Sequence, residues 1–87
     1  MMQEYKKMTM VESTNDWYEK ELEKETALNV QVYCDVDKGE VSFRYKDDTI
    51  QLLHIQAINV HGTGKRKTIE VIEGDGTKWV FVSKELM

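Results

Sequence analysis

The sequence predicts an α+β fold, in which an N-terminal helix packs on a strongly bent five-strand antiparallel sheet or small half-open barrel. Alternation of apolar and polar residues predicts the strands, because a strand with one buried face repeats every two residues. The clearest case is residues 28–36, in which Asn, Gln, Tyr and Asp separate apolar residues and Cys34. The charged run at residues 17–25 has helical composition instead. Turn residues separate the later segments.

The chain of 87 residues is long enough for one domain, in a size range where a single core is marginally stable. We expect residues 1–12 to be a mobile N-terminal segment, because chain termini are usually loose unless tied down. A short edge strand is the alternative, since Met8 and Met10 alternate with other residues there. Residues 13–87 then form a single small α+β domain.

A helix is predicted over about residues 15–26. Residues 13–15 are of capping types, whose side-chain oxygens accept the unpaired amides of the first turn. The apolar stripe is narrow and consists mainly of Trp17, Tyr18 and Leu22. We expect Trp17 and Leu22 to dock on the sheet, because a small domain needs its aromatic residues inside. The alternative is that Trp17 and Tyr18 form an exposed anchor for a partner protein.

The predicted strands cover residues 28–36, 40–46, 49–61, 68–72 and 78–82. Within 49–61 the apolar positions change phase near Leu52 and Leu53, which indicates a bulge or a sharp bend. A helical turn over residues 52–57 fits the same spacing. We favour the bent strand, because Ile and Val flank the phase change and no cap ends a helix there.

A glycine-containing basic segment follows at residues 62–67. It departs from the phosphate-loop pattern G-x-x-x-x-G-K-[ST], because Asn59 stands where the first Gly belongs and Arg66 replaces the hydroxyl residue. Three consecutive cations remain, Lys65, Arg66 and Lys67. With Lys78 they are the candidate contacts for a phosphate, an RNA backbone or an acidic partner. We favour the interpretation that residues 62–67 form a solvated hairpin tip.

No pattern of residues indicates catalysis, a metal or a cofactor. Two His residues seven positions apart, His54 and His61, fall on opposite faces of a regular strand, and no paired-cysteine spacing occurs. Cys34 shares the apolar phase of its strand, so we expect it to be buried rather than nucleophilic. The prediction is that the protein is not an enzyme and uses no metal or cofactor.

A single cysteine cannot form an internal disulfide, which favours a reducing compartment, and we expect a cytoplasmic location. There is no signal segment and no apolar run near 18 residues, so we expect no membrane contact. The net charge of −4 disfavours nucleic acid for the molecule as a whole. The predicted function is that of a small non-enzymatic interaction or regulatory protein, whose size and simplicity favour a bacterial or phage origin. The alternative is a nucleic-acid accessory protein that uses the basic loop at residues 62–68.

Self-association is a further prediction, because a small meander leaves at least one strand edge unpaired. We expect a homodimer through a strand edge or the helix face. The candidate interface consists of Trp17, Tyr18 and residues 79–82 of the last strand, which include Trp79. The alternative is a monomer whose edge is protected by Lys78, Lys84 and the N-terminal segment.

Overall fold

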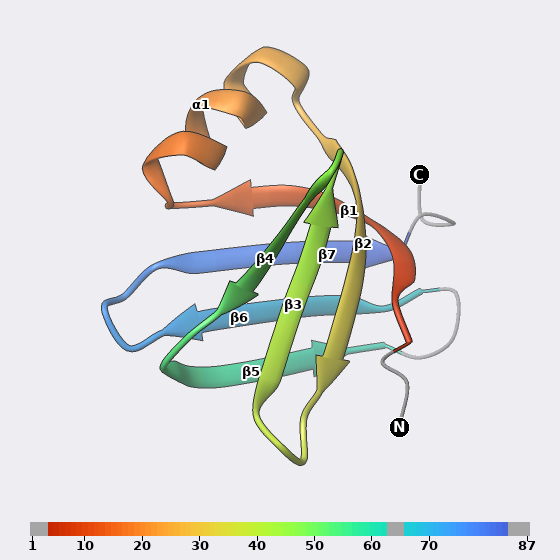
Figure 1. Ribbon diagram of the computed structural model, residues 1–87, viewed down its shortest axis with the longest axis vertical. Coiled ribbons are helices and arrows are strands. Elements are labelled where there is room, and N and C mark those ends of the chain that lie inside the picture. Colours follow the sequence, from red (N-terminus) through yellow and green to blue (C-terminus); the bar gives the residue numbers. More distant parts are fainter. Residues whose placement is uncertain (1–3, 63–65, 84–87) are drawn as a thin grey trace.

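Within residues 4–62 and 66–83, which the computed structural model describes, seven antiparallel strands form one sheet that curls into a half-barrel. One short helix lies across an end of this half-barrel (Figure 1). The elements are, in chain order, β1 (Lys6–Ser13), α1 (Asp16–Glu25), β2 (Leu28–Asp35), β3 (Glu40–Tyr45), β4 (Asp48–Leu52), β5 (Ile55–His61), β6 (Thr68–Glu73) and β7 (Lys78–Ser83).

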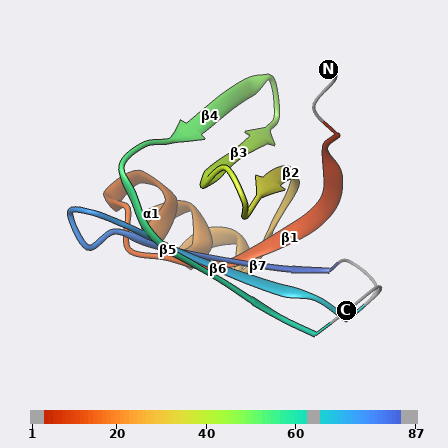
Figure 2. The same cartoon turned by 90° about the horizontal axis from the view of Figure 1, so that it is seen from below.

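The strand order is β4-β3-β2-β1-β7-β6-β5, so two strands that are consecutive in the chain, β4 and β5, form the two edges. Figure 2 shows β2, β3 and β4 as one wall and β5, β6 and β7 as the other, with β1 between them. Only Leu53 and His54 link β4 to β5. His54 has a φ of 54°, and its carbonyl accepts a hydrogen bond of 2.7 Å from the Gly74 N–H. The two edge strands are therefore joined through this two-residue link, which the bond from Gly74 ties to the turn between β6 and β7.

The predicted count of five strands is wrong, and part of the error lies at the N-terminus. Residues 6–13 form β1, which pairs with β2 on one side and β7 on the other. The strand is therefore central, neither a mobile segment nor an edge. Met8 and Met10 hold it in place, since both are buried in the core. Lys6 and Lys7, both exposed, weakened the apolar alternation on which the prediction depended.

The second error concerns residues 49–61, which form two strands and not one bent strand. The phase change at Leu52 and Leu53 marks the break correctly, but the chain leaves the sheet there and joins its other edge. A residue with positive φ, His54, allows this change of direction. The two halves pair with different strands, β3 and β6, which a pattern of alternation cannot reveal.

The helix forms close to its predicted range. The Asn15 Oδ1 accepts hydrogen bonds from the N–H groups of Trp17 and Tyr18, at 3.1 and 3.2 Å. Thr26 ends the helix with a φ of 64°. Tyr18 is buried and Leu22 is partly buried, whereas Trp17 is 54% exposed. Docking of Trp17 in the core was therefore a wrong prediction, because its neighbour Tyr18 takes that position.

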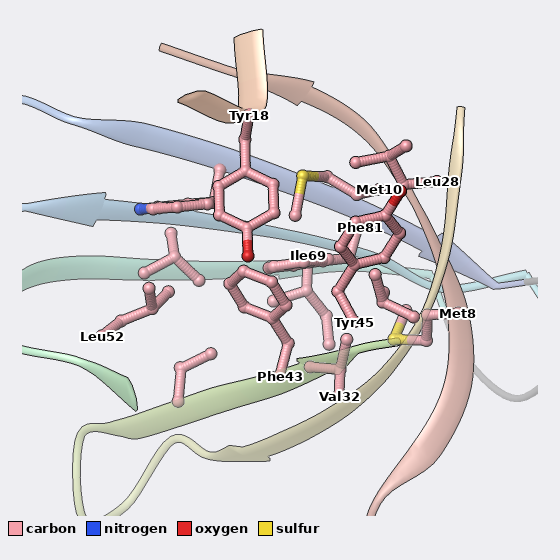
Figure 3. Close-up of a cluster of buried hydrophobic side chains, with 14 residues drawn as sticks. Met8, Met10, Tyr18, Leu28, Val32, Phe43, Tyr45, Leu52, Ile69 and Phe81 are labelled. Carbon is pink, nitrogen blue, oxygen red and sulfur yellow. The ribbon is translucent and has the colours of Figure 1, made fainter. Parts of the chain in front are cut away.

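The core lies inside the curl, between the two walls and beneath the helix. Figure 3 shows Tyr18 reaching down from α1 toward Phe43. The ring centroids of Tyr18 and Phe43 are 5.3 Å apart, and Phe43 also packs on Phe81 at 5.5 Å. Such tilted aromatic pairs add to the stabilisation from apolar burial. The helix therefore closes one end of the half-barrel through the buried Tyr18, with the partly buried Leu22 also packed against the core.

An acidic aromatic hollow as the candidate functional site

The three residues predicted as an interface, Trp17, Tyr18 and Trp79, line one hollow of about 400 Å³ at the helix end of the half-barrel. They come from the first turn of α1 and the start of β7. This volume falls in the range of about 300–1,000 Å³ that is usual for ligand sites. We call this site the aromatic hollow, and its other lining residues are Asn15, Asp48, Ile50, Gln51, Leu52 and Glu73.

The rings form a continuous edge-to-face cluster. Ring centroids lie 4.6 Å apart for Trp17 and Tyr18, and 5.4 Å apart for Tyr18 and Trp79. Trp17 also approaches Tyr45 at 6.2 Å. Tyr18 and Trp79 are buried, whereas Trp17 stands at the solvent side. The core thus fixes the floor of the aromatic hollow and leaves one large ring accessible.

Two carboxylates complete the rim. The Trp79 Nε1 donates a hydrogen bond of 2.8 Å to the Glu73 Oε1, which fixes the indole and leaves Glu73 at the hollow. Asp48 opens β4 and is exposed. Burial, with the charge of Asp48 as a second cause, raises the pKa of Tyr18, so this phenol stays neutral.

The surroundings of the aromatic hollow are also acidic. The helix α1 carries five carboxylates and two lysines, which gives it a net charge of −3. Among the described residues that line the hollow, Asp48 and Glu73 are the charged ones. A cation nearby already contacts the cluster, since the Lys46 Nζ lies 5.2 Å from the centroid of the Tyr45 ring. The geometry and the charge both suit a positively charged group.

The basic loop that the sequence singled out is not assembled with Lys78. Lys65 lies outside the described residues, and Arg66 is exposed. The Lys67 N–H donates to the Ser83 Oγ at 3.1 Å, and the Ser83 N–H donates to the Lys67 carbonyl at 2.8 Å. Lys78 stands at the opposite end of β7, five residues from Ser83, which corresponds to about 16 Å along a strand.

Lys78 is moreover paired with carboxylates. Its Nζ lies 3.3 Å from the Glu70 Oε2 and 3.5 Å from the Glu12 Oε2. The Asn59 Nδ2 donates to the other oxygen of Glu70 at 3.1 Å. These four residues form a polar ladder on the outer face of the sheet. The hydrogen bond to Glu70 and the charge of Glu12 raise the pKa of Lys78, so its charge is already compensated.

The remaining candidates do not gather into a reactive site. Cys34 is half-buried, and burial raises the pKa of its thiol, although the charge of Lys67 opposes this effect. The thiolate is the nucleophilic form, so Cys34 is not activated. Over residues 4–62 and 66–83, no group of three or more metal-ligating side chains occurs. In the same ranges, no helix is long and apolar enough to cross a membrane.

Sequence reasoning missed Asp48 and Glu73, which it assigned to turns. Asp48 follows a hairpin turn and Glu73 precedes another, and local turn chemistry accounts for both residue types. Asp48 and Glu73 lie close together because the sheet curls and brings β4 near the β6–β7 turn. No local pattern in the sequence encodes this curl.

Comparison with family models, curated proteins and solved structures finds no match to this chain.

Proposed function

We propose that this is a small non-enzymatic binding protein whose aromatic hollow takes a lysine or arginine side chain from a basic segment of a partner protein. The observation that supports this most strongly is the meeting of Trp17, Tyr18 and Trp79 with two carboxylates in one hollow. We place this interaction in the cytoplasm, in line with the absence of a disulfide pair in the sequence.

The chemistry favours a cation with an apolar stem. An ammonium or guanidinium group over an aromatic face gains about 0.5–2 kcal/mol, with the larger value where water is excluded. Asp48 and Glu73 add charge attraction at the rim, and Ile50 and Leu52 offer an apolar wall for the methylene groups. Trp17, being exposed, is placed to act as the anchoring ring.

Titration of the intrinsic tryptophan fluorescence tests the proposal. Short peptides whose cations are lysines are compared with the same peptides after lysine acetylation, which removes the charge but keeps most of the stem. The unmodified peptides are expected to change the emission saturably, and acetylation is expected to weaken binding at least tenfold. Equal binding of the acetylated peptides would contradict a cation site.

Matched variants locate the binding. Trp17→Ala and Asp48→Asn each remove a proposed contact, and each is expected to weaken binding about tenfold, which corresponds to 1.4 kcal/mol. Val36→Ala and Asp37→Asn are the controls, because both residues are exposed in the β2–β3 turn, away from the aromatic hollow. An equal loss in the control variants would contradict the placement of the site.

A further inference from the structure

A second surface of opposite charge covers the outer side of β1, β2 and β3. Lys7, Gln31 and Arg44 occupy adjacent register positions on these three strands. Strand spacing of about 4.8 Å places the first and third of them about 10 Å apart. With Lys46 they line a groove of about 330 Å³. We call this surface the basic face.

Lys7 and Arg44 of the basic face have no carboxylate partner close by. In the part of the chain that the structure describes, ion pairs within 4.0 Å involve Lys24 and Lys78, and none involves Lys7, Arg44 or Lys46. The outward positions that surround Lys7 and Arg44 on the three strands and on β4 carry no carboxylate, and they are Thr9, Asn29, Gln31, Ser42, Thr49 and Gln51. Lys46 differs, because Asp47 and Asp48 follow it in the turn between β3 and β4. Three cations therefore stand together on a molecule whose net charge is −4.

Two aromatic rings lie beside these cations. The ring centroids of Tyr5 and Tyr33 are 6.0 Å apart, and both residues are partly exposed. The Arg44 Cζ lies 3.9 Å from the centroid of Tyr5. The Tyr5 hydroxyl is 2.8 Å from the Ser42 Oγ, so the ring is held against the sheet. The basic face therefore combines cations with a fixed aromatic platform.

We propose that the basic face binds single-stranded nucleic acid, with phosphates at Lys7, Arg44 and Lys46 and bases on the rings of Tyr5 and Tyr33. Aromatic side chains on a cationic groove are the general means of binding single strands, because every base can stack. The amides of Asn29 and Gln31, which line the groove, can bond to base edges. An acidic peptide would use the cations but would leave the rings and amides without a role.

The extent of the basic face implies a short and weak site. Asp35 and Glu40 pair across β2 and β3 just beyond Tyr33, and their charges repel phosphate. Three phosphate contacts predict a slope of about −2 for the logarithm of affinity against the logarithm of salt concentration. Raising the salt from 50 to 200 mM should therefore weaken binding about 20-fold.

Fluorescence anisotropy with labelled twelve-nucleotide oligothymidine and oligouridine tests this inference. The full chain is expected to bind both, and the double variant Lys7→Gln/Arg44→Gln is expected to lose most of the affinity and to reduce the salt slope to about −0.7. Lys20→Gln/Lys24→Gln is the control, because it removes the same charge from the exposed side of α1. Circular dichroism verifies that each variant is folded.

Four outcomes would overturn the inference. The first is absence of binding at 50 mM salt, and the second is an equal loss of affinity in the helix control. The third is an equally tight complex with polyglutamate, which would make the basic face a docking surface for acidic proteins. The fourth is a loss of binding in Arg66→Gln/Lys67→Gln but not in Lys7→Gln/Arg44→Gln. That result would place the contact at residues 66 and 67 of the neighbouring loop.

Discussion

The aromatic hollow and the basic face are built in different ways. The hollow joins side chains from α1, β4, β6 and β7, and two of them, Tyr18 and Trp79, are also core residues. The basic face is a run of outward side chains on three neighbouring strands. If both surfaces bind as proposed, we expect binding and stability to be coupled in the aromatic hollow and separable on the basic face. The net charge of −4 does not reveal the two surfaces, because the charges of the acidic surface and of the basic surface partly cancel.

The largest expected difference between the two regions is in stability. Trp79→Ala removes a fully packed indole that contacts Tyr18 and Phe43, and truncation of a buried Trp costs about 3–5 kcal/mol. Lys7→Gln/Arg44→Gln changes exposed side chains and is expected to shift the free energy of unfolding by about 0.5 kcal/mol or less. Urea denaturation followed by circular dichroism measures both. Comparable losses in the two variants would contradict the proposed separation.

A stabilising change is expected on β1, the strand that links the two walls. The Thr9 Oγ1 is buried, and within the described residues it has no hydrogen-bond partner. Thr9→Val removes this unpaired hydroxyl with little change in shape and should raise the free energy of unfolding by about 1 kcal/mol. Thr9→Ser, which keeps the hydroxyl and loses a methyl group, is the matched control and should be destabilising. A less stable Thr9→Val would mean that the hydroxyl is paired.

A smaller effect is expected for the polar ladder on the outer face. The hydrogen bond from Asn59, followed by that from Lys78, lowers the pKa of Glu70 below its ordinary value of 4.5. A carboxylate with a lowered folded-state pKa stabilises the fold above its unfolded pKa, and this is lost as the pH falls through the folded value. Glu70→Gln should therefore lower the Tm at pH 7, and the difference should shrink toward pH 3.

Thermal melts at both pH values measure this difference. Glu23→Gln is the control, because Glu23 is an exposed carboxylate on α1 with no ion pair within 4.0 Å among the described residues. The ladder is exposed, so added salt should also reduce the effect of Glu70→Gln at pH 7. A Tm difference that grows toward pH 3 would contradict the sign of the pKa shift.

Local patterns in the sequence located the helix and four of the seven strands, but they did not give the number or the order of the strands. Alternation located β2, β3, β6 and β7 to within one or two residues, and the capping residue Asn15 located the helix. The pairing of β1 was not predictable, because its partners β2 and β7 stand far apart in sequence. The final strand β7 was expected as an interface edge, yet it pairs on both sides, and the edges are β4 and β5. Self-association through those edges is still a prediction.

The candidate site was predictable only in part. Trp17, Tyr18 and Trp79 stood out as aromatic residues in a small domain, and the structure brings them together. The carboxylates Asp48 and Glu73 could not be joined to them from the sequence, because the curl of the whole sheet decides their positions. The basic face was not predicted, because Lys7 lies on β1, which alternation did not identify, and because its alignment with Gln31 and Arg44 depends on the register between strands.

The most direct measurement is a titration of the ¹⁵N-labelled protein with a short lysine-containing peptide, followed by two-dimensional NMR. Both indole N–H signals report on the aromatic hollow, since Trp17 and Trp79 line it. We expect saturable shifts of these signals and of the Asp48 amide, with the amides of Lys7 and Gln31 unchanged. Shifts confined to other surfaces, or no shifts at millimolar peptide, would show that the aromatic hollow does not bind cationic side chains.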